Sequence, residues 1–320
     1  MTTGIAYSLA TIECLPLQRP VPPLWVNLIL TAYQAESHQT PKTLYCCLGD
    51  LVDKIPENKN MSDFELVDQV VIVTGAAGGI GQAISREFTE AGATVVLAGR
   101  TEASLSSLAS ELNEGKTLVV PTDITDPAAV EHLIDATMNS FGRIDVIINN
   151  AGGGSAMRKA EDTPYDEWVR LIDFNLTGTF NCCMAAGKKM IEQNSGKIIN
   201  ISSVAGTKGN PGMLHYSAAK AAVLSLTNNL AFMWAAHNIC VNAVVPGMIA
   251  TPQMIKWGII PADTNDEGEE VPRLTRPPGP EDVAAMCRFL ASPAADMITG
   301  EAIPVRAWFR PDRFWNYPWN

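Results

Sequence analysis

The sequence predicts an α/β protein of three layers, in which two layers of helices cover a doubly wound, mostly parallel sheet of seven strands. Two observations carry this prediction. From Val70 onwards, short apolar segments alternate with longer helical patterns, and apolar strands separated by helices indicate a parallel sheet covered on both faces. In addition, the glycine-rich turn TGAAGGIG lies at residues 74–81, between the first apolar segment and the first helical pattern.

The elements follow one another in a regular order along the chain. Strands are expected at residues 70–75, 94–99, 117–123, 144–149, 196–202, 238–245 and 301–305. Helices are expected at about residues 79–90, 102–112, 127–140, 164–193 and 214–236. Each of the first five strands is therefore followed by a helical pattern, as in repeated β–α units.

The two ends of the chain differ from this pattern. Residues 1–60 contain six prolines and no sustained periodicity, so they are expected to form an N-terminal extension that is poorly ordered or accessory. The folded domain is expected to span residues 61–306, a length that suits one domain. Residues 307–320 form an atypical aromatic tail that contains three of the seven tryptophans.

The composition excludes several classes of function. With 23 basic and 34 acidic residues, the net charge is −11, which argues against nucleic acid or an anionic membrane as the main partner. No apolar run approaches the ~18 residues of a membrane span. None of the seven cysteines has C-x-x-C or Cys/His ligand spacing, so no metal site is expected. Because no secretory or transit pattern is visible, we expect a cytoplasmic protein.

Residues 74–81 predict a phosphate-binding turn. Gly75 permits the tight turn, Gly79 lets the backbone approach a pyrophosphate, and Gly81 allows close packing of the helix. The N–H groups at the start of the helix would attract the anion. An ordinary strand–helix turn is the alternative, but strand, loop and helix follow in the order of a Rossmann-type nucleotide-binding unit.

The end of the second strand predicts the choice of cofactor. In LAGRTE, Gly99 stands where an acidic residue would hold the ribose hydroxyls of NAD, and Arg100 follows it. An arginine can hold the 2′-phosphate of NADP in a forked contact. NADP is therefore the preferred cofactor and NAD remains possible; a solvated surface arginine is the alternative interpretation.

The stretch HYSAAK places Tyr216 and Lys220 four residues apart. In a helix these side chains lie on one face, so the phenol and the ammonium group can meet. Taken alone, the pair favours a structural interpretation, a half-buried tyrosine beside a lysine that extends to solvent.

Five motifs in order distinguish these alternatives. The chain resembles the compact single-domain branch of the short-chain dehydrogenase/reductase family in TGAAGGIG (74–81), NNAG (149–152), INISS (199–203), YSAAK (216–220) and the PG turn (246–247). The resemblance runs from about Val70 to Val305. It implies a Rossmann-type fold and a homo-dimer or homo-tetramer.

The resemblance also implies a catalytic set, which consists of Asn175, Ser203, Tyr216 and Lys220. Tyr216 would exchange a proton with the substrate oxygen, although a free tyrosine titrates near ~10. Lys220 would supply the positive charge that stabilises the phenolate and would bind the nicotinamide ribose. Ser203 would hydrogen-bond the substrate oxygen, whereas the side chain of Ser202 should point to the opposite face of the strand. Asn175 would hold a water of the proton relay.

The implied cofactor site is larger. It comprises Gly75, Gly79, Ile80, Gly81, Arg100, Asp123, Ile124, Asn150, Ala151, Gly152, Tyr216, Lys220, Pro246, Gly247 and Thr251. Asp123 would meet the adenine ring, Asn150 would steady the central strands, and Thr251 would touch the carboxamide. Turn-forming or capping roles are the alternatives for Asp123 and Asn150. His215, next to the tyrosine, receives no function.

Together these features predict an NAD(P)-dependent oxidoreductase that transfers a hydride between nicotinamide and a small-molecule ketone or secondary alcohol. The alternatives are an NAD-linked hydroxysteroid or sugar dehydrogenase on the same scaffold, and a catalytically silent nucleotide-sensing protein. The complete catalytic set disfavours the sensor. In the family, residues 251–276 would form a lid, and its acidic stretch 262–270 has no base. This charge favours an uncharged ketone over a substrate on an acidic carrier.

Overall fold

The computed structural model describes residues 64–112, 115–154, 156–256, 270 and 272–307. The predicted extension at residues 1–60 lies outside the described residues. The same holds for almost all of the aromatic tail and for most of the acidic stretch 262–270. The expected boundaries of the domain therefore stay predictions.

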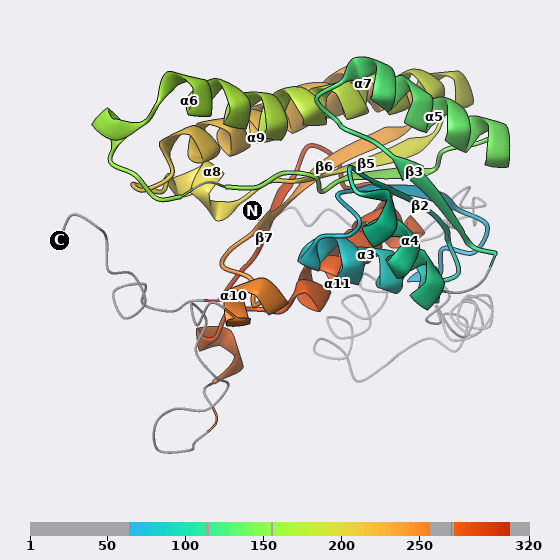
Figure 1. Ribbon diagram of the computed structural model, residues 1–320. Helices are drawn as coiled ribbons and strands as arrows, with labels where there is room; N and C mark the ends of the chain where they lie inside the picture. The colour runs from blue at the N-terminus through green and yellow to red at the C-terminus, as the bar shows by residue number, and fades with distance from the viewer. Residues whose placement is uncertain (1–63, 113–114, 155, 257–269, 271, 308–320) are drawn as a thin grey trace, which may run out of the picture. The chain divides into compact units, whose positions relative to one another are not determined.

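Seven strands form a single sheet in the described part of the chain (Figure 1). They are β1 (Val70–Thr74), β2 (Thr94–Gly99), β3 (Thr117–Pro121), β4 (Val146–Asn149), β5 (Gly196–Ile201), β6 (Ile239–Pro246) and β7 (Ala302–Val305). Their order is β3-β2-β1-β4-β5-β6-β7, and every neighbouring pair is parallel. The predicted doubly wound sheet is confirmed, with one correction: it is parallel throughout rather than mostly parallel.

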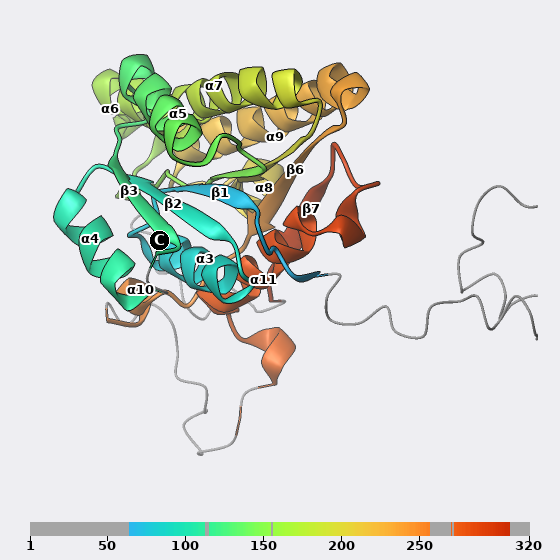
Figure 2. The ribbon, with the colours of Figure 1, turned by 90° about the vertical axis from the view of Figure 1, so that its right-hand side faces the viewer.

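Helices cover both faces of the sheet, as Figures 1 and 2 show. One layer consists of α3 (Gly79–Glu90), α4 (Glu102–Glu111) and α11 (Pro280–Ala291). The opposite layer consists of α5 (Pro127–Phe141), α6 (Tyr165–Ile172), α7 (Gly178–Gln193) and α9 (Leu214–Trp234). Two short helices, α8 (Val204–Lys208) and α10 (Pro252–Lys256), belong to the connections that follow β5 and β6. Among the described residues, no helix combines the length and the apolar character needed to cross a lipid bilayer.

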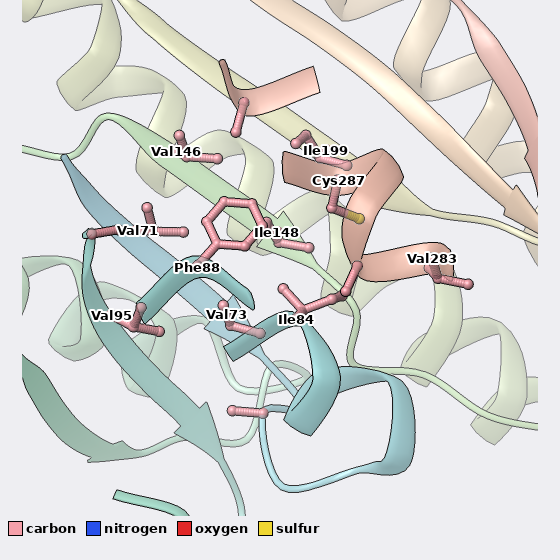
Figure 3. Close-up of a cluster of buried hydrophobic side chains, with 14 of the residues drawn as sticks. Val71, Val73, Ile84, Phe88, Val95, Val146, Ile148, Ile199, Val283 and Cys287 are labelled. Atoms are coloured by element: carbon pink, nitrogen blue, oxygen red, sulfur yellow. The ribbon is translucent and has the colours of Figure 1, made fainter. Parts of the chain in front are cut away.

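The strands are almost continuously apolar because helices cover them on both sides. All five residues of β1, VVIVT, are buried. Figure 3 shows Ile84 and Phe88 of α3 in one apolar cluster with Val283 and Cys287 of α11 and with strand residues such as Val71. A second cluster joins the opposite face to α5, α7 and α9. The sheet is thus held between two apolar layers, so polar site residues are expected at the ends of the strands rather than on the faces of the sheet.

Two helical features differ from the prediction. Helix α11 was not among the predicted helices, although Pro280 at its first turn and the Asp282 carboxylate, which accepts from Gly279 N at 2.9 Å, are typical start signals. The helix predicted at 164–193 is α6 and α7 joined by a π-helical turn at Asp173–Thr177. That turn contains Asn175, so the irregularity coincides with a predicted catalytic residue.

Candidate active site

The site lies where the order of the strands in the sheet reverses, between β1 and β4. β1 pairs with β2 on one side and with β4 on the other, so the connections that follow β1 and β4 leave in opposite directions. In open parallel sheets, ligands bind outside the carboxyl ends of the strands at this point. The glycine turn follows β1, NNAG ends β4, and Ser203 follows β5. The topology therefore collects the predicted motifs at one edge.

Lys220 and Tyr216 share a face of α9. The Lys220 side chain is buried, and its Nζ donates a hydrogen bond of 2.9 Å to the carbonyl oxygen of Ile201. The same nitrogen lies 5.8 Å from the centroid of the Tyr216 ring. Burial lowers the pKa of Lys220 from 10.5 to about 8, because removal from water disfavours the charged form.

Ser203 is the hydroxyl that meets the tyrosine. Burial raises the pKa of Tyr216, and a side-chain hydrogen bond with Ser203 opposes that rise. Ser203 Oγ also accepts from Ala205 N at 3.1 Å as the cap of α8. Ser202 Oγ instead donates to Lys220 O at 2.8 Å. The two serines therefore face different partners, as the alternation of a strand requires.

Asn175 is fully buried in the π-helical turn. Its Nδ2 donates to Gly153 O at 2.9 Å and to Leu171 O at 3.0 Å, and its Oδ1 accepts from Gly153 N at 3.0 Å. A Cβ at Gly152 would lie 2.8 Å from Asn175 Oδ1 and 3.0 Å from Lys220 Nζ. Gly152 thus stands close to both polar groups. Single π-turns within helices are frequent at functional sites, where the extra residue redirects a side chain.

The glycine turn fits a pyrophosphate. Gly75 has φ +63°, and a Cβ there would lie 2.9 Å from Ala151 Cα, so no other residue fits easily. A Cβ at Gly81 would collide with Gly75 O. The cap of α3, Gly78, makes no side-chain bond, and the first turn, which includes Ile80, has no acidic residue. The backbone N–H groups of this turn are therefore suited to an anion.

Asn150 joins the glycine turn to the end of β4. Its Nδ2 donates to Thr74 O at 3.0 Å and to Gly75 O at 3.1 Å. The backbone N–H groups of Asn150 and Ala151 both donate to Thr74 Oγ1 at 3.0 Å. The loop that would approach the pyrophosphate is thereby fixed to the NNAG segment.

Arg100 and Asp123 follow β2 and β3. Arg100 is exposed, and its guanidinium carbon lies 5.5 Å from the centroid of the Phe174 ring. The Asp123 carboxylate accepts from Thr125 N at 3.0 Å and Thr125 Oγ1 at 2.8 Å. The backbone hydrogen bond of Thr125 lowers the pKa of Asp123 most, burial opposes this, and the Thr125 hydroxyl and the charge of Arg100 lower it further. Arg100 is thus close enough to Asp123 to interact with it electrostatically.

The remaining predicted cofactor residues are also held by backbone contacts. Ile124 is buried, and its carbonyl oxygen accepts from Asn181 Nδ2 at 3.0 Å. Gly247, after Pro246 of β6, donates its N–H to Val305 O at 2.9 Å. A Cβ at Gly79 would lie 3.2 Å from Thr251 Cβ, which brings the segment after β6 against the glycine turn.

Sequence reasoning missed a buried polar bridge behind the site. Asn149 Nδ2 donates to Asn200 Oδ1 at 2.8 Å, and Asn200 Nδ2 donates to Thr227 Oγ1 at 2.9 Å. These contacts join β4, β5 and α9, which carry or precede the predicted catalytic groups. The available signal was an asparagine inside each of two apolar strands, since a buried amide requires a partner.

Comparisons with known proteins agree with this arrangement. A family model described as short chain dehydrogenase matches residues 69–258. The chain is 38% identical over 243 residues to the NAD-dependent glycerol dehydrogenase of Listeria innocua, which covers 75% of this chain and 92% of the relative. It is 39% identical over 249 residues to a 3-oxoacyl-[acyl-carrier-protein] reductase of Synechocystis, covering 75% and 96%. The crystal structure of gox2181 superimposes with a TM-score of 0.71 at 33% identity, covering 80% and 99%.

Proposed function

Because the chain belongs to the short-chain dehydrogenase family and is an NAD(P)-dependent oxidoreductase acting on alcohols or ketones, we propose that Tyr216 is its acid–base group and NADP its preferred cofactor. The proposed substrate is a small uncharged ketone or the matching secondary alcohol. One observation carries the catalytic assignment: Ser203 opposes the rise in the pKa of Tyr216 that burial causes, while Lys220 Nζ lies 5.8 Å from the centroid of the Tyr216 ring.

When bound, the nicotinamide would donate a hydride to the carbonyl carbon of a ketone or accept one from an alcohol. In the reducing direction, Tyr216 donates its proton to the carbonyl oxygen. Burial, which raises the pKa of Tyr216, favours the protonated form needed for that step. Ser203 orients the oxygen, and the charge of Lys220 stabilises the phenolate that remains. We assign Asn175 to a water of the path by which the tyrosine is reprotonated.

We propose that the cofactor is held in the crevice between the glycine turn and the NNAG segment. The first turn of α3, at Gly79 to Gly81, binds the pyrophosphate, and Lys220 binds the nicotinamide ribose. Ala151 and Gly152, Asp123 and Ile124, and the segment with Pro246, Gly247 and Thr251 complete the site. The preference for NADP rests on Arg100, whose guanidinium group is exposed at the carboxyl end of β2.

A small ketone is favoured over a carrier-bound chain for two reasons. One relative is named for glycerol, and residues 262–270 add acidic charge to the proposed lid. The second candidate is a 3-oxoacyl thioester, which the name of another relative favours. The two are separated by measuring kcat/KM for 2,3-butanedione and for acetoacetyl coenzyme A as salt is raised. A preference for the thioester that weakens with salt would reveal electrostatic attraction at the entrance of the substrate site. It would overturn the proposal of a small ketone.

We also propose a homo-oligomer that works in the reducing cytoplasm. Its support is apolar surface on the outer helices, since Phe180 of α7 is 44% exposed and Phe232 of α9 is 87% exposed. The four described cysteines are free thiols, which is consistent with a reducing compartment. Light scattering on the full chain measures the oligomeric state, and a monomer at micromolar concentration would contradict the first part.

Tyr216→Phe tests the acid–base assignment. The variant keeps the ring but has no proton to donate, so kcat with 2,3-butanedione and NADPH should fall by about 10²-fold or more. NADPH binding, followed by nicotinamide fluorescence, should change little. Tyr165→Phe is the matched control because Tyr165 is 80% exposed on α6. A Tyr216→Phe protein that keeps most of its turnover would remove Tyr216 from the mechanism.

A further inference from the structure

Glu167 of α6 holds two segments that come from different parts of the chain. Its Oε2 lies 2.8 Å from Arg158 Nε, and its Oε1 lies 3.6 Å from His215 Nε2. Arg158 belongs to the connection between β4 and α6, whereas His215 stands in the first turn of α9, directly before Tyr216. One carboxylate therefore joins the connection after NNAG to the helix turn that carries the proposed acid.

The same two segments contact each other without Glu167. Arg158 N donates to Gly212 O at 2.9 Å. A Cβ at Gly212 would lie 3.1 Å from Met157 Cβ, so the glycine allows the segments Ala156–Arg158 and Asn210–Met213 to lie side by side. Gly153, at the start of the first connection, is held by the Asn175 amide. The first connection is thus held to Asn175 at Gly153, and the second segment ends three residues before Tyr216.

The contacts of the Glu167 carboxylate should contribute more to local stability than a surface ion pair does, because they are largely buried. The side chain of His215 is 1% exposed and that of Glu167 is 12% exposed, whereas Arg158 is 42% exposed. Exposed ion pairs contribute little to stability, but removing Glu167 would take a polar partner from the buried His215 side chain, and buried polar groups need such partners. The pair Lys189–Glu192, with 34% and 66% exposure on α7, is the surface counterpart.

We propose that Glu167 is a positioning residue for the reaction. By holding Arg158 and His215, it fixes the distance between the segment Ala156–Arg158 and Tyr216, and this distance sets how the substrate carbonyl is presented to the phenol. Glu167 does not take part in proton transfer or cofactor binding. Its catalytic consequence rests on the proposed role of Tyr216, whereas the structural claim is independent of that role.

The structural claim is tested by hydrogen exchange on the full chain without substrate. Glu167→Ala should accelerate amide exchange in peptides covering 156–164 and 209–216, and leave the β5 peptide 196–201 unchanged. Glu167→Gln should restore part of the protection because its amide oxygen still accepts from Arg158. Glu192→Ala is the control and should leave all three peptides unchanged. Unchanged exchange at both sites in Glu167→Ala would overturn the proposal, and that result does not depend on turnover.

The catalytic consequence is tested with 2,3-butanedione and NADPH. Glu167→Ala should lower kcat/KM for the ketone by about tenfold or more, since small errors in position are costly in a reacting complex. KM for NADPH should stay within about twofold of the parent, and Glu167→Gln should recover part of the loss. Equal losses for ketone and cofactor, or no recovery in Glu167→Gln, would mean a general structural role. If Tyr216→Phe stays active while exchange responds as expected, the proposed function fails and the positioning claim stands.

Discussion

Lys220 Nζ donates its hydrogen bond to the carbonyl oxygen of Ile201 over 2.9 Å, with the lysine side chain almost completely removed from water. Ile201 is the last residue of β5, directly before the two serines. This contact fixes the ammonium group at the carboxyl edge of the sheet, beside Tyr216. Burial disfavours the charged form of Lys220 and lowers its pKa from 10.5 to about 8.

Replacing Lys220 with Met should therefore stabilise the fold while destroying activity. Between pH about 8 and 10.5 the folded lysine binds fewer protons than the unfolded one, so the stability of the parent rises with pH in this range. Below pH about 8 the folded protein bears the full cost of burying the charged lysine, which lowers the free energy of unfolding by at most about 3 kcal/mol. At neutral pH the free energy of unfolding of Lys220→Met should exceed that of the parent by up to that amount. The difference should vanish near pH 10.5.

Chemical denaturation at a series of pH values measures this difference. Lys208→Met on α8 provides a control, because it is the same substitution at a side chain that is exposed rather than buried. A stability difference between Lys220→Met and the parent that is constant from neutral to alkaline pH would contradict the explanation.

Replacing Arg100 with Ala should change the cofactor preference. If the guanidinium group contacts the 2′-phosphate, the variant loses about 1.5 to 3 kcal/mol of binding free energy for NADPH and much less for NADH. Fluorescence titration with both cofactors measures the two losses. Arg170→Ala on α6 serves as the control, since Arg170 is an exposed residue of the opposite helix layer. Equal losses for NADPH and NADH would show that Arg100 does not read the phosphate.

Replacing Asn200 with Ala should weaken the fold behind the site. The change leaves Asn149 Nδ2 without its Asn200 partner, and Thr227 Oγ1 without a donor. An unsatisfied buried polar group costs about 1 to 3 kcal/mol, so the free energy of unfolding should fall by at least that amount. Thr227→Val should cost less, because Asn149 keeps its bond to Asn200. Calorimetry on both variants measures the two losses of unfolding free energy. A larger loss in Thr227→Val than in Asn200→Ala would show that the bond between Asn149 and Asn200 is not the more stabilising one.

A chain that starts at Met61 should fold and turn over like the full chain. The earliest described contacts come just after that point: Phe64 O accepts from Arg288 Nε at 2.8 Å, and the fully buried Leu66 donates its N–H to Ala91 O at 2.8 Å. A chain that starts at Gln69 should be less stable because it lacks Leu66. Thermal unfolding and activity of the two shortened chains test this. Loss of folded protein in the longer one would show that residues 1–60 contribute to the domain.

Local patterns in the sequence were sufficient for the elements and for the principal motifs. Apolar runs marked all seven strands to within a few residues, because the covered strands of a parallel sheet are continuously hydrophobic. The glycine turn was recognisable because Gly75 needs φ > 0 and Gly81 has no room for a side chain. Tyr216 and Lys220 could be paired because i and i+4 share a helix face. Each of these properties depends on neighbours in the chain.

Only the tertiary structure revealed the contacts between residues far apart in the sequence. Asn149 and Asn200 are 51 residues apart, and they meet because β4 and β5 are adjacent in the sheet. The contact of Glu167 with Arg158 and His215 likewise depends on how α6 packs against α9. The lowered pKa of Lys220 has the same origin, since it comes from burial by several elements at once. Local sequence therefore determined which groups the protein has, whereas strand order and packing decided which groups meet and how they are charged.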